Sequence, residues 1–211
     1  KGDFMIIYHQ IEMCFSPEEY IVKNKEEQRG LCKNTFTICE EDELLLEINL
    51  QNNGTKIREK HVDLQVGFVL REDNLPLEPL EYCYPAREFV LSRENCNYNC
   101  TYGYRLPLSF VSALYKNKGI TLIFDDQEQS SVGVQKNSDI FQFVIKYRNV
   151  PVENGRRNII IKFHNGDWRQ GFDSYKSWYR EKYQENEKID QRLSGCYHIR
   201  RYFFNNQFCK K

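Results

Sequence analysis

Residues 43–51 read Glu-Leu-Leu-Leu-Glu-Ile-Asn-Leu-Gln, and this stretch decides the fold. From Leu44 onward every second residue is apolar, and most of the residues between them are polar. Because successive side chains of a β-strand point to opposite faces, the alternation predicts a strand with one buried face and one solvated face. The positions that we expect to be buried are Leu44, Leu46, Ile48 and Leu50.

The same alternation recurs along the chain, in residues 61–71, 119–124, 140–148 and 158–164. Turn-forming sequences separate these runs, including Asn52-Asn53-Gly54 and Asn154-Gly155. We therefore expect 43–51 and 61–71 to be antiparallel neighbours, and 140–148 and 158–164 to form a hairpin. Helical periodicity is almost missing before residue 165, so the sequence predicts an all-β fold, an antiparallel β-sandwich.

The period of the apolar residues changes after residue 165. Asp167 can accept hydrogen bonds from the free amides at a helix start, and the aromatic residues after it fall near helical spacing. This pattern predicts a C-terminal amphipathic helix over residues 168–184. Its aromatic residues are Trp168, Phe172, Tyr175, Trp178 and Tyr179. So many aromatic side chains favour packing against a larger apolar surface than a sandwich alone supplies.

These elements divide the chain into three parts. We expect a β-sandwich domain in residues 1–165, a connector helix and linker in residues 166–190, and the start of a truncated following domain in residues 191–211. Residues 196–204 carry one more strand pattern, without an evident neighbour. The chain begins at Lys1 without an initiator Met and ends directly after an apolar-aromatic run, so we expect a segment of a longer protein.

The composition argues against several classes of partner. The chain holds 30 Lys and Arg residues and 30 Asp and Glu residues, so no net charge attracts nucleic acid or an anionic membrane. No stretch approaches the roughly 20 consecutive apolar residues of a membrane-spanning helix. The eight cysteines lack the two close pairs of a zinc site, so we expect reduced, buried thiols and no metal. The compartment stays open, with a bacterial cytoplasm slightly favoured over secretion.

No complete active site is evident in the sequence. The chain has four histidines, and nothing in the sequence pairs one of them with a Ser or Cys nucleophile. Glycine-rich phosphate loops are missing, which argues against a nucleotide cofactor. The carboxylate runs at 40–43 and 125–126 lie at strand ends, where turn formation is the simpler role. We therefore expect no catalytic residue and no cofactor in this chain.

A group of tyrosines is the main candidate for binding. Tyr98, Tyr102 and Tyr104 lie with Tyr82 and Tyr84 in a turn-rich segment. Exposed aromatic rings can stack on the apolar faces of sugars, so a loop carrying these residues could line a carbohydrate-binding groove. The simpler interpretation, which we prefer, is that the rings fill a gap under a long loop.

The order of several motifs resembles a known family. The motifs are Leu106-Pro107-Leu108-Ser109-Phe110, Lys118-Gly119-Ile120-Thr121-Leu122 and Phe163-His164-Asn165-Gly166-Asp167-Trp168-Arg169, followed by Tyr175, Trp178 and Tyr179. Together they resemble the N-terminal galactose-mutarotase-like supersandwich domain of large glycoside hydrolases, which are α-galactosidase-like or endo-N-acetylgalactosaminidase-like. The resemblance covers roughly residues 105–200.

In that family a (β/α)8 barrel follows the supersandwich and carries the catalytic carboxylates. The resemblance therefore implies an architectural role, between sandwich and barrel, for Asp167, Trp168 and the other aromatic residues of the helix. Our leading hypothesis is a non-catalytic N-terminal domain of a bacterial glycoside hydrolase, with the barrel of the same parent chain as its partner. The alternatives are a stand-alone carbohydrate-binding module and a structural or adhesion domain.

Overall fold

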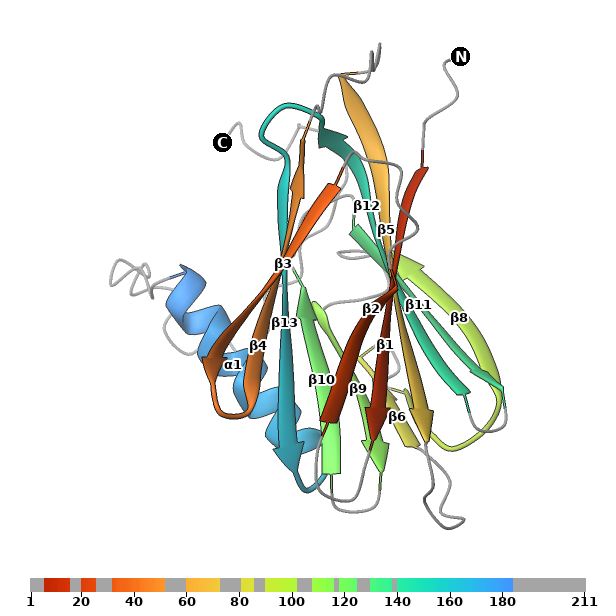
Figure 1. Cartoon of the computed structure of the whole chain (residues 1–211). Helices are drawn as coiled ribbons and strands as arrows, with labels where there is room; N and C mark the ends of the chain where they lie inside the picture. The colour runs from red at the N-terminus through yellow and green to blue at the C-terminus, as the bar shows by residue number, and fades with distance from the viewer. Residues whose placement is uncertain are drawn as a thin grey trace, which may run out of the picture. The chain divides into compact units, whose positions relative to one another are not determined.

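The computed structural model describes residues 6–15, 20–25, 32–51, 60–72, 81–85, 90–101, 108–115, 118–124, 130–137 and 140–183. Its strands form two sheets, and one helix follows the last strand (Figure 1). Residues 1–176 form one compact unit and residues 177–211 a second, whose described part is the end of the helix. The predicted all-β sandwich with a C-terminal helix is confirmed.

Among the described residues, seven strands form one sheet and six strands form the other. In order of pairing, the seven are β3 (Cys32–Glu40), β4 (Glu43–Leu50), β13 (Arg156–Asn165), β10 (Lys118–Phe124), β9 (Phe110–Tyr115), β6 (Glu81–Tyr84) and β7 (Val90–Ser92). The six are β2 (Tyr20–Lys25), β1 (Ile6–Phe15), β5 (His61–Glu72), β12 (Ile140–Pro151), β11 (Ser130–Asn137) and β8 (Cys96–Thr101). Among the described strands, the pairs are antiparallel except for β1 and β5, which run parallel. A parallel pair needs a long connection, and here β3 and β4 of the other sheet lie within it.

The main core lies between the two sheets. The positions predicted from the alternation face it: Leu46, Ile48 and Leu50 of β4 are buried, and Leu44 is half-buried. Strand β5 contributes the next set, Val62, Leu64, Val66, Phe68 and Leu70. Each fully buried side chain of this size contributes about 1.5–3 kcal/mol relative to an exposed one. This shared apolar layer therefore holds the two sheets face to face.

Both predicted strand pairings were wrong, although the strands themselves were found. Strand β4 pairs with β3 and β13 in the seven-stranded sheet, whereas β5 pairs with β1 and β12 in the six-stranded sheet. Likewise, β12 and β13 belong to different sheets. The alternation shows which face of a strand is buried, but both sheets bury one face in the same core, so it does not show which sheet a strand joins. The chain therefore crosses from one sheet to the other between β4 and β5 and again between β12 and β13. The predicted turn at 52–54 lies outside the described residues.

Helix α1 (Trp168–Tyr183) follows β13 after a sharp reversal of the chain. Gly166 has a φ of 94°, a backbone conformation that glycine adopts without steric cost. The first half of α1 covers the outer face of the seven-stranded sheet, where Phe110 of β9 contacts Phe172 and Tyr175 of the helix. This face of the sheet is therefore a second apolar layer beside the main core.

Candidate functional site

The start of α1 is fixed by Asp167. Its Oδ1 accepts a hydrogen bond from the backbone N–H of Arg169 at 2.8 Å, and its Oδ2 pairs with the Arg169 guanidinium. The backbone hydrogen bond favours the charged carboxylate and holds the pKa of Asp167 below its ordinary value. Asp167 therefore acts as the N-cap of the helix.

The aromatic residues in the first half of α1 pack against the sandwich itself. The ring centroid of Tyr175 lies 5.2 Å from that of Phe110, and the centroid of Phe172 lies 6.0 Å from it. Tyr175 is 4% exposed, and Phe110 is fully buried. Trp168 packs on Phe172, with ring centroids 6.4 Å apart. These contacts anchor the first half of the helix on β9.

The remaining two aromatic residues, Trp178 and Tyr179, belong to the second unit. The ring of Trp178 is half-buried and lies 4.7 Å from the ammonium group of Lys182, measured to the ring centroid. Tyr179 is 44% exposed. The five aromatic residues expected at an interdomain contact therefore divide between the two units, with Trp168, Phe172 and Tyr175 in the first and Trp178 and Tyr179 in the second.

Three polar side chains from three neighbouring strands form a hydrogen-bonded chain beneath α1. Ser112 Oγ in β9 lies 2.7 Å from Thr121 Oγ1 in β10, and Thr121 Oγ1 lies 3.0 Å from His164 Nε2 in β13. Ser112 and Thr121 are fully buried. A buried hydroxyl that loses its hydrogen-bond partner costs about 1–3 kcal/mol, so Thr121 is the residue on which both other groups depend.

Two glycines make room for the Ser112–Thr121–His164 chain. Gly119 lies opposite His164 in the β10–β13 register, and a Cβ on Gly119 would lie 2.2 Å from imidazole Cε1. On the helix side, a Cβ on Gly171 would lie 2.0 Å from Thr121 Oγ1. The imidazole and the helix backbone therefore occupy space that only glycine leaves open.

Burial shifts the pKa values of two groups beneath α1, His164 and Cys83. Burial lowers the pKa of His164, although the backbone of Asn165 and the carboxylates of Asp167 and Asp42 oppose this shift. Cys83 of β6 lies opposite Ser112 in the register, and burial, together with the charge of Asp167, raises the pKa of its thiol to about 12. A thiol with this pKa is almost fully protonated at neutral pH and is a poor nucleophile. The arrangement is suited to holding the helix in place.

Tyr98 is the one member of the proposed sugar-binding group that the structure describes, and Tyr102 and Tyr104 lie outside the described residues. Tyr98 of β8 stacks on Tyr84 of β6, with ring centroids 6.1 Å apart and planes 10° apart. Tyr84 is 1% exposed, and its hydroxyl donates to the carbonyl of Val132 at 3.4 Å. The Tyr98 ring is 41% exposed. The ring of Tyr84 therefore fills space in the interior, whereas the ring of Tyr98 reaches the surface.

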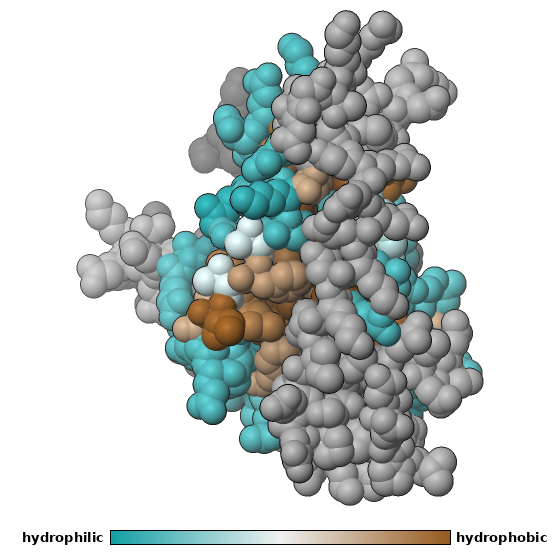
Figure 2. Space-filling model, viewed as in Figure 1, coloured by the Kyte–Doolittle hydropathy of each residue, from teal (hydrophilic) through white to brown (hydrophobic). Residues whose placement is uncertain are grey.

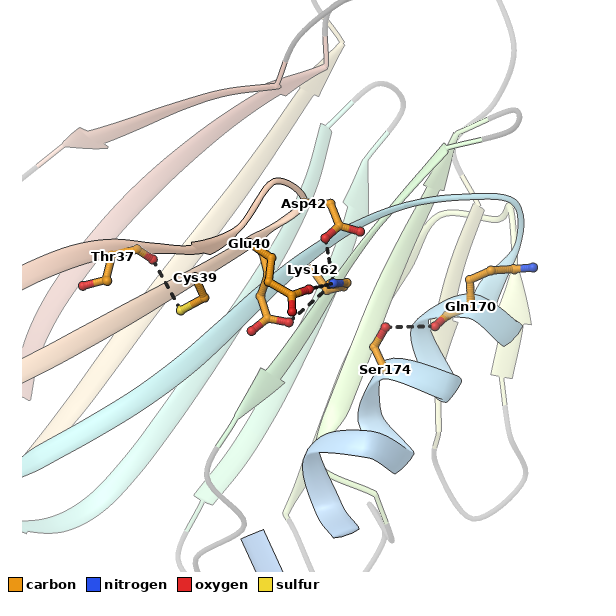
Figure 3. Close-up of polar contacts among 8 residues, drawn as sticks. Thr37, Cys39, Glu40, Asp42, Lys162, Gln170 and Ser174 are labelled. Atoms are coloured by element: carbon orange, nitrogen blue, oxygen red, sulfur yellow. Dashed lines mark hydrogen bonds and ion pairs between the residues drawn. The ribbon is translucent and has the colours of Figure 1, made fainter. Parts of the chain in front are cut away.

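Lys162 of β13 binds the acidic turn between β3 and β4 (Figure 3). Its Nζ lies 2.7 Å from Asp42 Oδ1, 3.4 Å from Glu40 Oε2 and 3.5 Å from Glu43 Oε2. Burial of the ammonium group opposes the charged form, but the hydrogen bond and charge of Asp42, with the two glutamates, raise the pKa of Lys162. The carboxylates of this turn therefore fix the end of the β3–β4 hairpin on β13.

Metal sites and membrane spans were also sought in the part of the chain that the structure describes. No group of three or more His, Cys, Asp or Glu side chains is placed there to hold a metal ion. No helix in the described ranges is long and apolar enough to cross a membrane.

Sequence reasoning missed the Ser112–Thr121–His164 chain. No local sequence pattern pairs His164 with a residue of another strand. The available signal was a pair of hydroxyl residues and a glycine inside two otherwise apolar strands, because glycine within a strand often marks the close approach of another group. Comparison with protein-family models and with curated proteins finds no match to this chain.

Proposed function

We propose that this chain is a non-catalytic β-sandwich domain that supports a neighbouring domain through α1. The observation that carries the proposal is the anchoring of the first half of the helix on the sheet. This first half is anchored on β9 through Phe172 and Tyr175, and the same helix continues through Trp178 and Tyr179. A domain joined to this helix would be attached to the sandwich through the contacts of Phe172 and Tyr175 with Phe110.

The chemistry beneath the helix supports a non-catalytic role. His164 is held by Thr121, and its pKa is lowered by burial. Cys83 is fully buried with a raised pKa. Neither group is poised to attack or protonate a substrate in solution.

The class of the parent protein rests on the resemblance of the ordered motifs. In the hydrolases that these motifs resemble, the strand-to-helix junction leads from sandwich to barrel, and here Asp167 caps a helix that starts shortly after β13. The proposed parent is therefore a glycoside hydrolase, and the proposed partner is its catalytic barrel. An architectural or adhesion domain without a sugar role is the competing assignment.

Two measurements test this proposal. The transcript that encodes the chain, sequenced past Lys211, is expected to continue into alternating strand and helix patterns of a (β/α)8 barrel; a stop codon there would overturn the supporting role. The purified chain, incubated with aryl α-galactosides and aryl N-acetyl-α-galactosaminides, is expected to release no more phenol than buffer does. Release in proportion to protein concentration would show an active site of its own.

A second candidate function, carbohydrate contact, is favoured by the exposure of Tyr98. Its ring is supported from behind by buried Tyr84, so stacking on a sugar would cost little side-chain entropy. Titration calorimetry with galactose and N-acetylgalactosamine tests this contact. We expect Tyr98→Ala to weaken binding roughly tenfold, the loss of an aromatic contact of about 1–1.5 kcal/mol. Tyr179→Ala, at a tyrosine of similar exposure, is the matched control. No binding by the unaltered chain would remove this candidate.

A further inference from the structure

The outer face of the six-stranded sheet is rich in amide side chains. Alternate residues of β1, β5, β11 and β12 lie in the core, so the residues between them point away from it. In β8 it is Cys96 that packs against the core, so Asn97 and Asn99 point outward as well. The amide residues of this face are Gln10, Gln65, Gln135, Gln142, Asn97 and Asn99. Helix α1 covers the other sheet, and within the described ranges no helix covers this one.

Tyr8 lies across this amide-rich face. A Cβ on Gly67 of β5 would overlap the Tyr8 hydroxyl oxygen and lie 2.9 Å from its ring carbon Cζ, so the end of the ring occupies the space above Gly67. The Tyr8 hydroxyl accepts a hydrogen bond from Gln142 Nε2 of β12 at 3.2 Å. The side chain thus starts on β1, crosses to β5 and is held from β12. Because Tyr8 is half-buried, the sheet supports the ring and leaves part of it exposed.

A hollow lies in the same part of the sheet as this ring. The register aligns Gly67 of β5, Val144 of β12, Gly133 of β11 and Asn99 of β8 in one row across the strands. The side-chain atom nearest to a Cβ on Gly133 would be Val144 Cβ, at 3.9 Å, so the space above Gly133 is open. Neighbouring strands are about 4.8 Å apart, which places the hollow about 10 Å from Gly67. The row therefore offers a ring at one glycine and free space at the other.

The chemistry of the face favours an uncharged ligand that carries hydroxyl groups. A side-chain amide has donors and an acceptor, and a hydroxyl group also donates and accepts, so the two match in both directions. Gln135 and Gln142 lie opposite each other in the register, in the row beside the hollow. In the two rows that flank Gly133, the charged residues are Glu12, which is buried, and Lys146. No cluster of one sign is present there to attract a polyion.

Exposed apolar surface lies mainly elsewhere. Figure 2 shows hydrophobic surface over the end of β3 and β4, in the other sheet, bordered by hydrophilic residues. Ile38 of β3 is 76% exposed. Of the large hydrophobic residues exposed in the described chain, Ile6 at the start of β1 is the one on the amide-rich face. Because the buried centre of a protein–protein interface is apolar, this face fits a sugar chain better than a protein.

We propose that the amide-rich face binds a neutral oligosaccharide, with one sugar ring stacked on Tyr8 and another lying above Gly133. Aromatic rings stack on the apolar faces of sugars, and the amides beside the hollow bind the hydroxyl groups. The site is separate from the Tyr98 contact, because Tyr98 packs on Tyr82 and Tyr84 on the core side of β8. It also does not depend on the class of the parent protein.

Affinity electrophoresis of the full chain tests for this binding. The native gels contain galactomannan, xylan or mixed-linkage β-glucan, which are neutral, or polygalacturonate or heparin, which are anionic. We expect at least one neutral polysaccharide to slow the chain and the anionic ones to leave its migration unchanged. A chain that no neutral polysaccharide slows would overturn the proposal. Equal slowing by the anionic polysaccharides would overturn it too, because it would show binding by charge.

Gly133→Val separates binding from folding. Gly133 lies in a regular strand without a positive φ, and valine is favoured in strands, so the variant should keep the circular dichroism spectrum and at least the urea midpoint of the unaltered chain. It is expected to weaken binding roughly tenfold or more, because its side chain fills the hollow.

Two tyrosine variants locate the sugar. Tyr8→Ala is expected to weaken binding about tenfold through loss of the stacked ring. Tyr98→Ala, the matched control at the other exposed tyrosine of this sheet, is expected to leave it unchanged. Binding that survives both Gly133→Val and Tyr8→Ala would place the sugar on another surface and overturn the proposal.

Discussion

Thr121 Oγ1 in β10 lies 3.0 Å from His164 Nε2 in β13, and Gly171 of α1 approaches this hydroxyl so closely that a Cβ would overlap it. The same hydroxyl lies 2.7 Å from Ser112 Oγ. One side chain thus joins three strands and the helix above them.

Thr121→Val should destabilise the fold while keeping its shape. Valine replaces the hydroxyl with a methyl group of similar size and leaves the Ser112 hydroxyl and the His164 imidazole without their shared partner. Because buried polar groups without partners are costly, the free energy of unfolding should fall by about 1–3 kcal/mol. Urea denaturation followed by circular dichroism measures this change. Thr37→Val, at an exposed position of β3, is the control and should change it by less than about 0.5 kcal/mol. Equal effects would mean that the hydrogen-bonded chain contributes nothing.

Stability should depend on the protonation of His164. Burial holds its pKa in the folded protein below the ordinary value of 6.5, so the unfolded chain binds a proton more readily than the folded one. Stability contributed by the neutral imidazole is therefore present above pH 6.5 and is lost as pH falls from 6.5 toward the lowered pKa. Lys162, Asp42 and Asp167 are the charged groups that act on this histidine.

The measurement is the urea midpoint at several values of pH on both sides of 6.5, for the unaltered chain and for His164→Gln. The variant should show a smaller loss of stability on acidification, and the other histidines cancel in the difference. Identical pH dependence in the two proteins would remove His164 as the group responsible.

Cysteine reactivity should separate Cys39 from Cys83. Cys39 is exposed, whereas Cys83 is buried and its thiol pKa is raised from 9.0 to about 12. This difference in pKa alone reduces the thiolate fraction about a thousandfold. Under native conditions iodoacetamide should therefore label Cys39 long before Cys83, as mass spectrometry of tryptic peptides can follow. Fast labelling of Cys83 would indicate a reactive thiol and would contradict the non-catalytic role.

The sequence predicted strands better than it predicted their neighbours. Alternation of Leu44, Leu46, Ile48 and Leu50 identified β4 and its buried face correctly, because side-chain direction follows directly from strand geometry. The same alternation led to the wrong pairing of β4 with β5, because both strands bury an apolar face in the one core between the sheets. Long-range pairing, such as β1 with β5, depends on how the whole chain packs and leaves no local pattern.

The candidate-site residues divide in the same way, because local features were predicted and long-range contacts were not. Asp167 was recognised as a helix cap because capping depends on neighbours in sequence, and it accepts the Arg169 amide as expected. The pairing of Thr121 with His164 spans 43 residues, and local patterns do not report such contacts. Among the tyrosines, only the packing of the two sheets separates buried Tyr84 from exposed Tyr98. The positions of Tyr84 and Tyr98 in the sequence offered no reason to expect different exposures.

Hydrogen–deuterium exchange of the full chain, read for individual peptides of α1, tests the central claim most directly, since the supporting role requires the first half of the helix to be anchored on the sandwich. The amides of residues 171–176 should exchange at a rate similar to those of β9 and β10, because the helix and the sheet share the contacts of Tyr175 and Thr121. Exchange of these amides at the rate of an isolated helix, while β9 and β10 stay protected, would contradict the account.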